Sequence, residues 1–110
     1  AVTVPDPGAG DWPNYGNDDA GTRFSPLAQI TSANVAQLQP AWTYKISDAA
    51  TRTEATPLKI GRVIYSCSTY NEVFALDAET GKQVWRYNPH VDPSTIPTAA
   101  CRGVASSSSA

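Results

Sequence analysis

The feature that most constrains the fold is a turn at residues 77–81, which lies between two apolar runs. Residues 73–76 (Val-Phe-Ala-Leu) precede the turn, and residues 84–87 (Val-Trp-Arg-Tyr) follow it. The Asp77 carboxylate can accept hydrogen bonds from backbone N–H groups two or three residues further on, and Gly81 tolerates a positive φ. The chain can therefore reverse here, and the pattern predicts an antiparallel β-hairpin.

Two more strands are predicted ahead of this hairpin. The four strands together lie near residues 56–60, 62–68, 72–77 and 83–88. Short strands at this spacing, separated by turn residues, are typical of an antiparallel sheet such as a propeller blade. The second and third strands are apolar at successive positions, which indicates burial on both faces, as between neighbouring blades.

The chain before these strands is less regular. Residues 30–38 predict one short helix with Thr31 or Ser32 as its N-cap. Residues 41–46 alternate apolar and polar side chains, which predicts a lead-in strand with Trp42 as a core anchor.

An aromatic-containing segment precedes the predicted helix. Trp12, Tyr15 and Phe24 lie among turn residues, so we expect an irregular segment that single aromatic side chains anchor. We interpret Arg23, within the same segment, as a structural hydrogen-bond donor.

The bulk composition excludes several functions. The 110 residues carry a formal net charge of −2, so there is no basic surface for nucleic acid and we expect no such partner. No apolar run approaches the roughly 20 residues that span a bilayer. No signal-peptide pattern opens the sequence, so an exported protein would already have lost that segment.

The two cysteines, Cys67 and Cys101, are far apart and lack the spacing of a zinc site. They are either two buried thiols or one disulfide, and a disulfide would destabilise the unfolded chain by about 3–4 kcal/mol. The one histidine, His90, lies in a proline-containing loop. We interpret it as a solvated residue in preference to a catalytic one.

Several stretches together resemble the N-terminal part of periplasmic quinoprotein dehydrogenases, which use pyrroloquinoline quinone (PQQ), and especially the glucose, polyol and quinate type. The hairpin matches the family's tryptophan docking motif, Ala-x-Asp-x-x-x-Gly-x-x-x-Trp, at Ala75 to Trp85. In the family, the indole of each blade packs against the motif of the neighbouring blade. The other matching stretches are Asp11-Trp12-Pro13-x-Tyr15-Gly16, Arg23 to Ile30, Asn34 to Trp42, Glu54-x-Thr56-Pro57 and Cys101-Arg102-Gly103.

The resemblance implies an all-β fold, an eight-bladed β-propeller with PQQ and a calcium ion on its axis. This chain would supply about one blade plus a lead-in strand and one short helix. We expect an arm at 1–10, a lead-in segment with the helix and strand at 11–53, the first blade at 54–88, the start of the next blade at 89–105 and a mobile tail at 106–110. A lone blade leaves its faces and edges uncovered. We therefore expect the remaining blades on a second polypeptide, or on one separated by cleavage near the serine tail.

The resemblance also implies two cofactor contacts in this chain. Arg102 matches the family arginine that pairs with a PQQ carboxylate, a group that suits the guanidinium fork. Glu54 matches a glutamate that also touches the cofactor. The family's catalytic aspartate and calcium ligands lie downstream of the matched stretch, so we assign none here. The oxidising periplasmic context favours a disulfide between Cys67 and Cys101.

Two features depart from the family pattern and concern the group that stacks on the quinone. The disulfide between adjacent cysteines that the alcohol dehydrogenases use is absent. The glucose-type enzymes have a histidine four residues before the arginine, and Thr98 occupies that position here.

The function implied is part of a PQQ-dependent periplasmic dehydrogenase that oxidises a sugar, polyol or cyclic alcohol and passes electrons to a quinone or cytochrome c. The alternative is a non-catalytic propeller piece, such as an outer-membrane assembly scaffold. Glu54 and Arg102 discriminate between the two, because a scaffold needs no pocket for a tricarboxylate.

Overall fold

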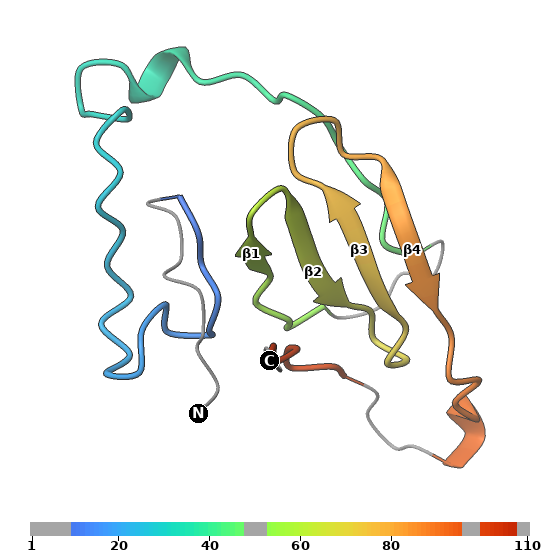
Figure 1. Cartoon of the computed structure of the whole chain (residues 1–110). Coiled ribbons are helices and arrows are strands. Elements are labelled where there is room, and N and C mark those ends of the chain that lie inside the picture. Colours follow the sequence, from blue (N-terminus) through green and yellow to red (C-terminus); the bar gives the residue numbers. More distant parts are fainter. Residues whose placement is uncertain (1–9, 48–52, 96–99, 108–110) are drawn as a thin grey trace.

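The structure, a computed structural model, describes residues 10–47, 53–95 and 100–107 (Figure 1). Its centre is an antiparallel sheet of four strands in the order β1-β2-β3-β4. The strands are β1 (Leu58–Ile60), β2 (Val63–Cys67), β3 (Val73–Asp77) and β4 (Gln83–Tyr87). The predicted all-β class and all four predicted strands are confirmed.

The turn between β3 and β4 forms as the sequence predicts. Asp77 Oδ1 accepts hydrogen bonds from the backbone N–H groups of Glu79 and Thr80, each at 2.9 Å. Gly81 has a φ of +74° and donates its N–H to the Asp77 carbonyl at 2.8 Å. Arg62, between β1 and β2, donates from Nε to Asp77 Oδ2 at 2.8 Å. The N–H of Thr80 and the Arg62 guanidinium together lower the pKa of Asp77 to about 2.

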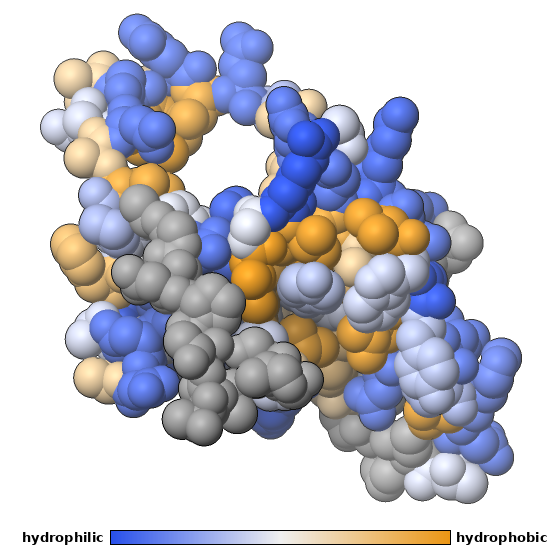
Figure 2. Space-filling model, viewed as in Figure 1, coloured by the Kyte–Doolittle hydropathy of each residue, from blue (hydrophilic) through white to orange (hydrophobic). Residues whose placement is uncertain are grey.

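The core lies in the middle of the sheet. Phe74, Ala75 and Leu76 of β3 are buried at successive positions, as predicted for a strand that is covered on both faces. Leu58 of β1 and Cys67 of β2 complete the buried apolar set. The edge strand β4 instead exposes three large apolar side chains, Val84, Trp85 and Tyr87. Apolar side chains gather over the sheet on the face shown in Figure 2.

The predicted lead-in strand over residues 41–46 does not form. Partly buried and exposed residues do alternate there, but the segment is attached to the sheet through side chains and not through a backbone ladder. The Tyr44 ring lies 5.3 Å from the Phe74 ring, between centroids, and the Tyr44 hydroxyl donates to Gln83 Oε1 at 2.8 Å. Arg86 Nη2 donates to the Ile46 carbonyl at 2.9 Å. These contacts place the segment against one face of the sheet, where it cannot extend the strand order.

The predicted helix is shorter than expected and begins later. It is a three-residue 3₁₀ helix, η1 (Val35–Gln37), with Asn34 and not Thr31 or Ser32 at its N-cap. The Asn34 side chain accepts the Thr31 N–H at 2.8 Å, and this local bond competes with a longer helix. Among the described residues, no helix is long and apolar enough to cross a bilayer.

A second short helix, η2 (Pro93–Thr95), was not predicted. Asp92 accepts the Ser94 N–H at 2.9 Å, and proline suits the first position of a helix. The Asp92-Pro93 pair was therefore a usable signal for this turn.

The aromatic segment before η1 differs in part from the prediction. Trp12 is partly buried and pairs with Lys59 of β1 through two backbone hydrogen bonds, at 2.7 and 2.9 Å. Tyr15 and Phe24 are 57% and 68% exposed, so they do not anchor the segment to the sheet. Arg23 lies with its guanidinium carbon 4.5 Å from the centre of the Tyr15 ring, so its side chain makes a cation–π contact.

Candidate cofactor site

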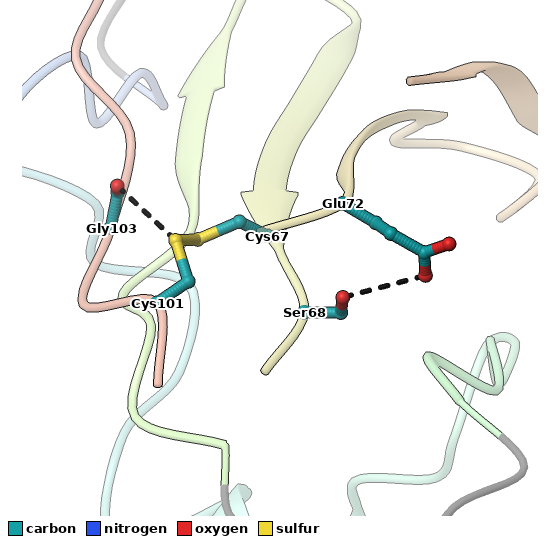
Figure 3. The surroundings of a disulfide bond; sticks show 5 residues. All are labelled: Cys67, Ser68, Glu72, Cys101 and Gly103. Carbon is teal, nitrogen blue, oxygen red and sulfur yellow. Dashed lines mark hydrogen bonds between the residues drawn. A yellow bond between two sulfur atoms is a disulfide. The ribbon is translucent and has the colours of Figure 1, made fainter. Parts of the chain in front are cut away.

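The segment that carries Arg102 is attached to the sheet on both sides of that residue. Cys101 forms a disulfide with Cys67 at the end of β2 (Figure 3). Gly103 forms a parallel β-bridge with Thr56, just before β1. Because β1 and β2 are antiparallel, the start of β1 and the end of β2 lie at the same end of the sheet. Arg102 is therefore held at that end.

The two predicted cofactor residues meet there. Arg102 Nη2 lies 3.8 Å from Glu54 Oε2. The side chain of Arg102 is 87% exposed, and that of Glu54 is 30% exposed. An ion pair of this length and exposure is weak, so the guanidinium can still bind a second carboxylate. The contact of either residue with a cofactor stays a prediction.

The end of β2 is a firm support for this site. Cys67 is fully buried, and the chain turns tightly after it. Ser68 donates its N–H to the Glu72 carbonyl at 2.8 Å and accepts the Asn71 N–H at 3.1 Å. Asn71 takes a φ of +60°, a conformation that asparagine tolerates better than most residues. Cys67 therefore lies where burial and the tight turn restrict the backbone, and the disulfide has a fixed anchor in the sheet.

Sequence reasoning missed a polar cluster on the adjoining strand. Arg86 of β4 forms an ion pair with Glu72 and donates from Nη1 to the Tyr44 hydroxyl at 2.9 Å. The Glu72 carboxylate raises the pKa of Arg86. This cluster holds the lead-in segment on the sheet. Its sequence signal is weak, because the partners come from three separate stretches of the chain.

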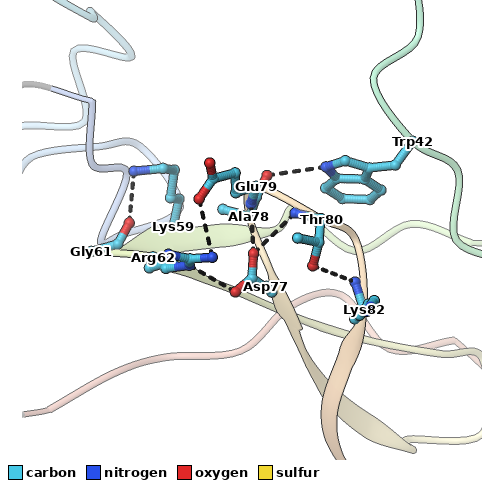
Figure 4. A network of polar contacts seen from close by, with 9 residues as sticks. All are labelled: Trp42, Lys59, Gly61, Arg62, Asp77, Ala78, Glu79, Thr80 and Lys82. Atoms are coloured by element: carbon cyan, nitrogen blue, oxygen red, sulfur yellow. Dashed lines mark hydrogen bonds and ion pairs between the residues drawn. The ribbon is translucent and has the colours of Figure 1, made fainter.

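Trp42, predicted as a core anchor of the lead-in strand, docks on the turn between β3 and β4, a partner that the sequence did not indicate. Its indole N–H donates to the Ala78 carbonyl at 3.0 Å, in the turn between β3 and β4 (Figure 4). A Cβ added to Gly81 would lie 2.4 Å from Trp42 Cδ2, so the ring lies directly against the glycine. Trp42 thus docks on this motif as an indole of a neighbouring blade would. Trp85, the motif's own tryptophan, is 44% exposed, with its ring 6.2 Å from that of Tyr65.

The remaining predicted residues do not add to the site. His90 is exposed and has a φ of +57°. Its backbone N–H donates to Asn88 Oδ1 at 2.8 Å. Thr98, most of the predicted arm at 1–10 and the end of the predicted tail lie outside the described residues. Within the described ranges, no group of three or more His, Cys, Asp or Glu side chains could hold a metal ion.

Comparison with known proteins identifies the family. The PQQ enzyme family described as glucose/ethanol/alcohol dehydrogenase, beta-propeller domain, matches residues 12–110. The chain belongs to this family. PQQ is therefore the cofactor that a site formed by Glu54 and Arg102 must fit.

Curated relatives and solved structures agree with this assignment. The glycerol dehydrogenase large subunit of Gluconobacter thailandicus is 43% identical over 89% of this chain and 14% of that protein. The quinoprotein glucose dehydrogenase of Escherichia coli K12 is 39% identical over 86% of this chain and 13% of that protein. The quinohemoprotein alcohol dehydrogenase of Comamonas testosteroni superimposes with a TM-score of 0.70, at 40% identity, over 74% of this chain and 12% of that chain. A europium-containing methanol dehydrogenase superimposes with a TM-score of 0.81, at 30% identity, over 92% of this chain and 19% of that chain.

These figures also set the scale of the chain. It spans 14% and 13% of the length of the two curated relatives, about the share of one blade with its flanking segments. One blade with flanking segments is what the described residues form, so the partial-propeller fold predicted from the sequence is confirmed.

Proposed function

We propose that this chain supplies PQQ contacts and part of the propeller ring of a periplasmic dehydrogenase that oxidises a sugar, polyol or cyclic alcohol. The observation that carries the proposal is the meeting of Glu54 and Arg102 at one end of the sheet, 3.8 Å apart. Relatives named glycerol, glucose and quinate/shikimate dehydrogenase support the substrate class.

The proposal extends to the rest of the assembly. The remaining blades, the calcium ligands and the catalytic residues belong to the part of the ring that these 110 residues do not cover. The electron acceptor is a quinone or a cytochrome c. One relative is named quinate/shikimate dehydrogenase (quinone) and another 1-butanol dehydrogenase (cytochrome c), which supports both types. We call this chain together with the remaining blades the assembled protein.

The residues present fit PQQ. When bound, PQQ supplies the two-electron acceptor for alcohol oxidation, and it carries three carboxylates. Arg102 offers an exposed guanidinium fork to one of these carboxylates. Glu54, partly buried beside it, accepts a hydrogen bond from a cofactor N–H while Arg102 offsets its charge. A non-catalytic scaffold is not favoured, because it needs no such pair and the family match extends through Arg102.

The direct test is Arg102→Ala in the assembled protein, freed of PQQ and titrated with the cofactor. Leaving a covered carboxylate without its charged partner costs about 2–5 kcal/mol. The PQQ concentration for half-reconstitution should therefore rise by about thirtyfold to several thousandfold. Arg102→Lys should restore part of the affinity, because it keeps the charge but loses the fork.

Arg62→Ala is the matched control. Arg62 is also an exposed arginine paired with carboxylates, Asp77 and Glu79, but it lies in the β1–β2 turn, at the opposite end of the sheet. It should leave the PQQ titration unchanged. If Arg102→Ala reconstitutes at the same PQQ concentration as the parent protein, Arg102 is a structural arginine and the proposed site is wrong.

A further inference from the structure

We infer that the Cys67–Cys101 disulfide is a positioning device for Arg102, so that it sets PQQ affinity through that guanidinium and not by touching the cofactor. The inference rests on the proposed function. It concerns a residue pair whose role goes beyond stabilising the fold.

The residues on either side of Arg102 are both linked to the sheet. Cys101 is the residue immediately before Arg102, and its sulfur is bonded to that of Cys67, which has no exposed surface. Gly103, the residue immediately after, pairs with Thr56. Glu54 lies two residues from Thr56 on the same stretch. Both members of the charged pair are therefore fixed relative to the same end of β1 and β2.

Apart from the disulfide, the attachments of residues 100–107 to the rest of the chain are weak. The described residues 100–107 contain no strand. Among the described residues, and apart from the bridge at Gly103, one hydrogen bond ties this segment to an earlier part of the chain: Ser106 Oγ donates to the Pro13 carbonyl at 3.4 Å. The Arg102 side chain is 87% exposed, so it has little packing of its own. The covalent link is thus the strong restraint on the backbone that aims the guanidinium.

Cys67, one half of the disulfide, is buried, whereas Cys101 is partly exposed. Because Cys67 is wholly buried under the sheet end, its sulfur has no surface on which a quinone could stack. The two cysteines are also not neighbours in the sequence, so they differ from the adjacent pair that serves that purpose in related alcohol dehydrogenases. The Cys67 half of the bond therefore offers no surface to the cofactor.

The expected loss of PQQ affinity follows from the backbone freedom that the disulfide removes. Without it, the backbone at Arg102 must be ordered when PQQ binds, a cost equivalent to fixing about one residue. The PQQ concentration for half-saturation should then rise by about fivefold to thirtyfold.

The test is a double-mutant cycle on equilibrium PQQ binding, measured by titration calorimetry of the PQQ-free assembled protein with calcium present. The Cys67→Ala/Cys101→Ala protein should bind PQQ about fivefold to thirtyfold more weakly than the parent. In an Arg102→Ala background, the same two substitutions should change affinity by less than about twofold. Phe74→Leu, a buried change in β3, is the control for general destabilisation and should leave PQQ affinity unchanged.

A second arm needs no variant to fold. The parent protein, already folded, is reduced with a phosphine, and the thiols of a separate aliquot are counted by alkylation and mass. PQQ binding of the unalkylated protein is measured before and after reoxidation. Reduction should weaken binding, and reoxidation should restore it.

The outcomes separate this inference from the proposed function. If Arg102→Ala itself leaves PQQ binding unchanged, the proposed function fails. If Arg102→Ala weakens binding but loss of the disulfide lowers only the unfolding temperature, the positioning role is wrong. If loss of the disulfide weakens binding equally with and without Arg102, the disulfide acts on PQQ by another route and the inference is overturned.

Discussion

Gly81→Ala should disrupt the docking of Trp42 and loosen the hairpin between β3 and β4. The substitution has two effects that can be separated. Gly81 has a φ of +74°, which costs a residue with a Cβ about 1–2 kcal/mol. The new Cβ would also lie 2.4 Å from Trp42 Cδ2, so the indole must move away.

Gly61→Ala isolates the first effect. Gly61 has a similar φ of +59°, but no heavy atom lies within 4 Å of an added Cβ. Its substitution should therefore cost only the backbone strain. Gly81→Ala adds the loss of the 3.0 Å hydrogen bond from Trp42 to the Ala78 carbonyl and of part of the indole's burial. We expect an additional cost of about 2–3 kcal/mol.

Native-state hydrogen exchange of the assembled protein measures this difference locally. Amides of the hairpin, including those of Asp77 and Gly81, should exchange about thirtyfold to a hundredfold faster in Gly81→Ala than in Gly61→Ala. In a Trp42→Ala background the clash is absent, so Gly81→Ala should then speed hairpin exchange only by the factor that its backbone strain accounts for, about fivefold to thirtyfold. Equal exchange rates in the original background, within about threefold, would show that the indole contact contributes nothing to the turn.

Two further outcomes follow from the fold. The pKa of Asp77 is lowered to about 2 by the Thr80 N–H and the Arg62 guanidinium, so its ionised form stabilises the turn above about pH 4 and this stabilisation is lost as the pH falls toward 2. Asp77→Asn should abolish that pH dependence in hairpin hydrogen exchange, and an unchanged profile would assign it to other carboxyls. The chain of 110 residues expressed alone should show no cooperative melt by circular dichroism, because β4 exposes Val84, Trp85 and Tyr87, and a sharp two-state transition would contradict this.

Local signals in the sequence predicted the sheet because each strand is specified by its own residues. The turn at Asp77 and Gly81 forms from hydrogen bonds within five residues, and the buried run of β3 follows directly from its continuous apolar sequence. The prediction of a lead-in strand was wrong for the opposite reason. Alternating side chains at 41–46 report burial on one side, and the sequence does not say whether a ladder or a sheet face provides that burial.

The docking of Trp42 was beyond a local pattern. Trp85 is recognisable because Gly81 lies four residues before it, whereas Leu38 occupies that place before Trp42. The pairing of Glu54 with Arg102 was likewise not predicted from spacing, although the family resemblance pointed to both residues. Their approach depends on the disulfide and on the bridge between Thr56 and Gly103, which join stretches far apart in the chain.

The two ends of this sheet therefore carry different interactions. The β3–β4 turn at one end receives Trp42, and the backbone bond from Ala78 N–H to the Arg62 carbonyl, 2.8 Å long, ties that turn to the β1–β2 turn. The other end carries the disulfide, Glu54 and Arg102. Strands of five residues separate the ends by about 13–17 Å, and perturbations that far apart without shared partners are nearly additive. Gly81→Ala should thus weaken the hairpin without changing PQQ affinity, while loss of the disulfide should change affinity at the far end. A large change in PQQ affinity in Gly81→Ala would mean that the sheet transmits strain between its ends.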